Sequence, residues 1–117
     1  MGFHHSTYFA YGVHVEIPED EYAPARAERI NEQLLAAAER CPDVGTLTAG
    51  AYDADRLFLA THCDEVKLGY FAHVTPEAFP PEQVANWTHQ LAQAVHALGI
   101  PPEQHSAPGW ICVPDMA

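Results

Sequence analysis

The sequence predicts an α+β protein: a single mixed β-sheet of about five strands with two helices on one face, in a ferredoxin-like or related sandwich. Two stretches with apolar residues at helical spacing, each introduced by proline, alternate with shorter runs in which every second residue is apolar. The resulting order is β-α-β-β-β-α-β. Helical connections between strands favour right-handed crossovers, which place both helices on the same face. The length of 117 residues suits one domain over residues 1–117.

The first strand and the first helix follow from their apolar spacing. Residues 6–17 alternate, so that one face is apolar and His14 lies on the other. The apolar face consists of Phe9, Tyr11, Val13, Val15 and Ile17. Pro24 suits the first turn of a helix that runs to about Cys41, because the N–H that proline lacks has no partner there. The buried stripe of this helix is expected to be Ala27, Ile30, Leu34, Ala38 and Cys41.

Three further strands are expected between the helices, at residues 46–52, 57–63 and 66–74. A two-residue turn at Asp64 and Glu65 joins the last two into a hairpin. The register of this hairpin places Leu59, Cys63 and Tyr70 toward the helices. The opposite face then receives Phe58, His62, Phe71 and His73.

The second helix is expected to open with Pro80 and Pro81 and to end at Gly99, because proline suits a first turn and glycine suits a helix end. Its apolar stripe is Val84, Trp87, Leu91, Val95 and Leu98. We expect Trp87 and Leu91 to pack under the sheet against Val13 and Leu59. Residues 107–113 form the last, short strand.

Two segments that begin Tyr-Phe-Ala, at Tyr8 and Tyr70, suggest an internal β-α-β duplication. Both continue to a His-Val pair, an acidic and proline-rich turn, and a helix. The apolar stripes of the two helices are offset by a constant 57 positions. The repeat equates Phe9, expected in the core, with Phe71, expected on the opposite face. A bulge at Gly12 would reset the alternation and remove this conflict. Otherwise the repeat or the face assignment is wrong.

Charge and composition narrow the class of partner. Sixteen acidic and five basic residues give a formal net charge of −11. This disfavours nucleic acid and anionic membrane surfaces, which bind Lys and Arg, and favours encounter with a basic protein. No apolar run approaches the roughly 20 residues of a membrane helix. Three widely spaced cysteines fit a reducing, cytoplasmic location, and the absence of known cofactor motifs leaves no cofactor expected.

The sheet face opposite the helices carries the candidate site, which consists of His14, Phe58, His62, Phe71 and His73. Exposed aromatic residues are typical of interaction surfaces, so this face is predicted to bind a protein partner or a second copy of the chain. The expected function is that of a small acidic, non-enzymatic inhibitor, accessory or adaptor protein. One alternative is an ordinary solvated face. Another is a metal or small-ligand site, in a protein that could be an enzyme, formed by His14, His62 and His73.

Overall fold

The computed structural model describes residues 5–18, 20–51 and 54–116, and it has an α+β architecture. Its strands and helices follow in the order β1 (His5–Val15), α1 (Ala23–Ala36), β2 (Gly45–Ala51), β3 (Ala54–Lys67), η1 (Pro76–Ala78), α2 (Pro81–Ala97), η2 (Pro102–Gln104) and β4 (Gly109–Met116). The predicted class is confirmed. The described residues contain four strands where about five were expected.

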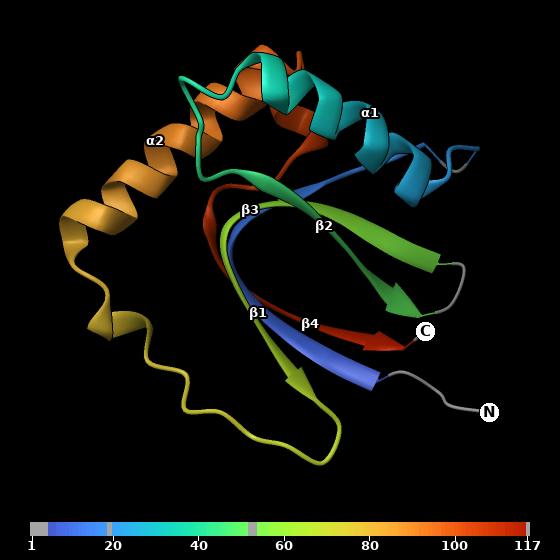
Figure 1. Ribbon diagram of the computed structural model, residues 1–117. Coiled ribbons are helices and arrows are strands. Elements are labelled where there is room, and N and C mark those ends of the chain that lie inside the picture. Colours follow the sequence, from blue (N-terminus) through green and yellow to red (C-terminus); the bar gives the residue numbers. More distant parts are fainter. Residues whose placement is uncertain (1–4, 19, 52–53, 117) are drawn as a thin grey trace.

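The four strands form one sheet in the order β2-β3-β1-β4, in which these neighbours are antiparallel. The sheet is curled, and its edge strands β2 and β4 meet at one parallel pair, Ala51 and Met116 (Figure 1). β1 is central, with β3 on one side and β4 on the other. Both of its faces are covered in the middle, and the residues from Ala10 to Val13 are all buried.

Both helices lie on one face of the sheet, which we call the helix face (Figure 1). Trp87 and Leu91 of α2 belong to the same buried cluster as Val13 of β1 and Leu59 of β3, as predicted. Ile30 of α1 belongs to the same cluster. Burying one large apolar side chain such as that of Leu91 contributes about 1.5–3 kcal/mol through its removal from water. This cluster is therefore the main source of the protein's stability.

The opposite face, which we call the far face, carries a second and smaller core. Ala49 of β2, Phe58 of β3 and Val113 of β4 pack together there. The sequence predicts an open face at this position. The curl of the sheet brings the far-face side chains of different strands together, so that Phe58 is only 5% exposed.

The path of β3 departs most from the prediction. The strand runs through Asp64 and Glu65 to Lys67, so the expected hairpin turn does not form. β1 supplies a partner for these residues, because Phe9 lies opposite Asp64 and Tyr8 lies opposite Glu65. Residues 68–74 do not form the expected next strand. The two Tyr-Phe-Ala segments therefore have different structures, and the expected duplication is not seen in the fold.

The two helices begin close to where the sequence predicts and end earlier. Pro24 lies in the first turn of α1 and Pro81 in the first turn of α2. α1 ends at Ala36 and α2 at Ala97. Within the described part of the chain, neither helix combines the length and the apolar character that crossing a membrane requires.

Candidate functional site

The structure distributes the five predicted site residues over three places. His14 and Phe58 lie on the far face, where their ring centroids are 5.2 Å apart. His62 lies on the helix face beside Trp87. Phe71 and His73 lie in the exposed connection that follows β3. The expectation that all five share one face is wrong.

His14 is held in place by the connection before β4. Its backbone N–H donates to Ser106 Oγ at 2.9 Å, and its carbonyl accepts from the Ser106 N–H at 2.9 Å. Burial lowers the pKa of the His14 imidazole, nearby Arg56 lowers it further, and Glu16 opposes the shift. The ring is therefore neutral at neutral pH and packs against Phe58, which belongs to the second core.

A β-bulge moves His62 from the far face to the helix face. Tyr11 pairs with His62 and Gly12 pairs with Ala60, so Thr61 is an extra residue on β3. An extra residue reverses the alternation of the residues beyond it. The bulge occurs beside Gly12, but its extra residue belongs to β3. A side chain at position 12 would overlap the carbonyl oxygen of Leu59, which explains the glycine.

His62 is part of an aromatic cluster that the sequence pattern did not reveal. Its ring stacks on Trp87 with centroids 5.6 Å apart and planes 18° apart. Phe79 lies at 4.8 Å and Trp110 at 6.2 Å from the same ring. His62 Nε2 lies 3.0 Å from Asp64 Oδ2. A carboxylate can orient a histidine as a general base, but here the ring mainly joins β3 to α2.

Cys63 does not supply a reactive group next to His62. It is exposed, although the sequence predicted a buried structural cysteine. Desolvation raises the pKa of its thiol, and the Asp64 and Glu65 carboxylates raise it further, so the thiol stays protonated at neutral pH. Among the residues that the structure describes, no three His, Cys, Asp or Glu side chains are placed to hold a metal ion.

Residues 68–74, which we call the apolar segment, project from the body of the protein (Figure 1). Phe71 is 85% exposed, Tyr70 76% and Leu68 74%. The chain leaves the sheet at Gly69, whose φ of 88° suits glycine, and the Tyr70 N–H donates to the Lys67 carbonyl at 3.0 Å. The Leu68 N–H donates at 3.0 Å to the carbonyl of His5, which is the first described residue of β1.

The apolar segment borders open space on the body of the protein. A cavity of about 580 Å³ lies beside it, with Lys67, Leu68, Tyr70, Pro114 and Met116 in its wall. A second hollow of about 370 Å³ includes Phe71 and Ala72. The segment therefore lies beside two hollows that open to solvent and are separate from the two cores.

No protein-family model, curated protein or solved structure matches this chain. Its function is therefore inferred from the geometry of the chain itself.

The sequence analysis placed Tyr70 toward the helices, whereas the structure exposes it together with Leu68 and Val74. Two signals in the sequence point to this outcome. Gly69 interrupts the run, and residues 68–76 contain no Asp, Glu, Lys or Arg in a chain that has 21 of them. Neither signal distinguishes a buried strand from an exposed interaction segment without the position of β1.

Proposed function

We propose that this protein is a non-enzymatic interaction protein that docks on another protein molecule through the apolar segment, as an inhibitor, accessory or adaptor protein does. The observation that carries the proposal is the exposure of Phe71, at 85%. Among the described residues, seven large apolar side chains are exposed, and four of them lie in this segment: Leu68, Tyr70, Phe71 and Val74. Such clustering is typical of interaction surfaces.

Burial of these side chains supplies the driving force for docking. Each large apolar side chain that leaves water contributes about 1.5–3 kcal/mol before the costs of association are subtracted. Aromatic residues are the most frequent anchors of interfaces, which makes Phe71 and Tyr70 the expected centre of the contact. The segment lies outside the sheet, so docking leaves the core intact.

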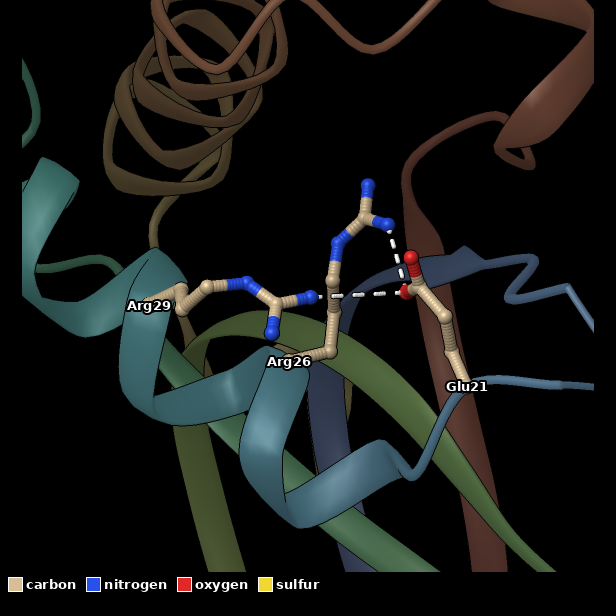
Figure 2. Close-up of polar contacts among 3 residues, drawn as sticks. All are labelled: Glu21, Arg26 and Arg29. Carbon is tan, nitrogen blue, oxygen red and sulfur yellow. Dashed lines mark hydrogen bonds and ion pairs between the residues drawn. The ribbon is translucent and has the colours of Figure 1, made fainter.

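The charge of the chain supports rapid encounter with basic surfaces. Two of its five basic residues, Arg26 and Arg29, are engaged by Glu21: its Oε2 lies 2.7 Å from Arg26 Nη1 and 3.6 Å from Arg29 Nη2 (Figure 2). These pairs are partly exposed and of small energetic value. They leave the net charge of −11 unchanged, and this field attracts cationic surfaces over several ångströms.

The element order β-α-β-β-α-β supports an assignment of the sandwich to the ferredoxin-like or a related architecture. That architecture hosts many unrelated functions, so it adds no weight to docking. The alternative function, a metal or small-ligand site formed by His14, His62 and His73, gains no support from their placement. His14 and His62 lie on opposite faces of the sheet.

A photo-reactive phenylalanine analogue tests the docking proposal. It is introduced in place of Phe71 and, as a matched control, in place of Leu35, which is 79% exposed on α1. Both proteins are irradiated in native lysate at low and at high salt. We expect position 71 to form a discrete cross-linked product that position 35 does not form. Identical products at the two positions, or none at position 71, would contradict the proposal.

A further inference from the structure

We propose that, in the isolated protein, the apolar segment binds the same segment of a second copy of the chain. Residues 70–74 of the two copies pair as antiparallel strands about a twofold axis at Ala72. This inference rests on the proposed function, because it names the occupant of the same segment. The resulting homodimer covers the segment, so self-association and docking on a different protein exclude each other.

The backbone of the apolar segment is available for strand pairing. Phe71, Ala72, His73 and Val74 form no backbone hydrogen bond with any other described residue. The rings of Phe71 and His73 are 6.0 Å apart, which is the placement of alternate side chains along an extended chain. Exposed N–H and C=O groups in an extended, apolar stretch are a template for pairing with another strand.

The side chains of the segment are complementary to themselves under twofold symmetry. With Ala72 opposite Ala72, Tyr70 lies opposite Val74 and Phe71 lies opposite His73. These are aromatic–β-branched and aromatic–aromatic pairs, which stabilise antiparallel strands. A twofold interface repeats every contact, so each favourable pair occurs twice.

Charge favours a second copy over a basic protein at this segment. Two copies with a net charge of −11 each repel one another over most of their surfaces. Residues 68–76 contain no charged side chain, so the paired strands place no like charges directly opposite one another. The nearest carboxylates, Glu65 in the hollow beside Phe71 and Glu77 after the segment, flank the contact and are screened over a Debye length of about 8 Å. A basic partner finds no carboxylate in the segment to pair with. We therefore expect added salt to strengthen the homodimer, whereas it weakens docking on a cationic surface.

The area of five paired residues is small compared with the roughly 800 Å² per partner of a standard interface, so a weak dimer is expected. Analytical ultracentrifugation of the purified protein should show its mass rising from 12.9 kDa toward twice that value with concentration. Phe71→Asp should raise the dissociation constant about 30-fold or more, because a charge replaces an aromatic anchor. Leu35→Asp, at an equally exposed site, should leave it unchanged.

Cysteine cross-linking tests the register in a background with Cys63→Ala and Cys112→Ala, which removes the two exposed thiols. Ala72→Cys should oxidise to a covalent dimer, because directly opposed Cβ atoms lie about 4.5–5.5 Å apart, close enough for a disulfide after small adjustment. Phe71→Cys should cross-link with His73→Cys in a mixture and much less with itself. Leu35→Cys, the matched control, should stay monomeric.

The possible outcomes separate the two proposals. A protein that stays monomeric up to about 1 mM, well above the micromolar range of weak complexes, and that forms no disulfide at position 72 overturns pairing with a second copy. Docking on another protein survives that result if the photo-reactive group at position 71 still cross-links a different protein. Self-cross-linking of Phe71→Cys or of His73→Cys that is as efficient as cross-linking in the mixture of the two overturns the antiparallel register. Circular dichroism of each variant confirms that loss of the dimer does not reflect unfolding.

Discussion

The imidazole of His62 stacks on the indole of Trp87, with ring centroids 5.6 Å apart and planes 18° apart. This contact joins the bulged strand β3 to the helix α2. Asp64, two residues further along β3, holds the same ring through His62 Nε2 at 3.0 Å. The bulge at Thr61 thus converts a residue expected on the far face into a contact between sheet and helix.

Trp87→Ala should destabilise the protein by about 3–5 kcal/mol, because it removes a large buried side chain and leaves a cavity. Trp87 is 4% exposed and also contacts Phe79 and Trp110. Urea unfolding followed by circular dichroism measures the loss. His96→Ala, on the exposed side of the same helix, should change stability by less than about 0.5 kcal/mol. A Trp87→Ala protein with the melting temperature of wild type would show that this cluster is not part of the core.

Gly12→Ala should destabilise the protein by about 1–3 kcal/mol, because the added methyl group overlaps backbone atoms that cannot move independently. Its nearest neighbours would be the Leu59 carbonyl and Ala60 Cα on β3. Gly45→Ala is the matched control, since a Cβ there meets nothing within 4 Å. Thermal unfolding compares the two variants. Equal melting temperatures would mean that β1 and β3 are not in close contact at the bulge.

Gln90→Met should lower the free energy of unfolding by about 1–3 kcal/mol. It removes the buried amide group that forms hydrogen bonds with the backbone N–H and the carboxylate of Asp43. Gln90 is 4% exposed, and its Oε1 accepts the Asp43 N–H at 2.8 Å. Its Nε2 donates to Asp43 Oδ2 at 2.9 Å. Chemical unfolding measures the change, with exposed Gln83→Met as control. A cost as small as that of the control would argue against the bond between α2 and the turn before β2.

His14 should make stability depend on pH. Burial, together with Arg56, lowers the pKa of His14 in the folded protein, while Glu16 opposes this. The unfolded chain then binds more protons than the folded chain below the ordinary value of about 6.5. The stabilisation from neutral His14 is present above that pH. It is lost as pH falls through about 6.5 toward the lower, folded pKa.

The test compares wild type with His14→Asn in unfolding experiments between about pH 7 and pH 5, the interval that spans the ordinary histidine pKa. Wild type should lose more stability over this interval than His14→Asn. His89→Asn, at an exposed position of α2, should follow wild type. If wild type and His14→Asn lose equal stability, His14 is not desolvated in the folded protein.

The helices and most of their buried stripes could be predicted from the sequence because their spacing is a local property. Ala38 is the exception: it was expected in the stripe of the first helix, but α1 ends at Ala36, and Ala37 is buried in place of Ala38. A period near 3.6 residues places Trp87 and Leu91 on one side of α2 wherever the helix docks. Alternation likewise predicted that His14 lies opposite the core residues Val13 and Val15. These predictions depend on neighbours within a few positions along the chain.

The candidate site could be predicted only in part because its geometry depends on pairing between distant residues. Phe71 and His73 were correctly expected to be exposed, although they lie in a connection and not in a strand. His62 was placed on the wrong face, because an extra residue at Thr61 cannot be seen until β3 is aligned with β1. Phe58 was expected in the open, but the curl of the sheet covers it.

The sequence by itself determined the α+β class, the two amphipathic helices, the first strand and the acidic charge. Only the tertiary structure decided that β3 continues through Asp64 and Glu65, and that residues 68–74 are left outside the sheet. A strand needs a partner for its backbone groups as well as a suitable pattern. Among the described residues, β1 pairs with β3 as far as Ser6 and Lys67, and residues 68–74 have no strand partner and form an exposed segment.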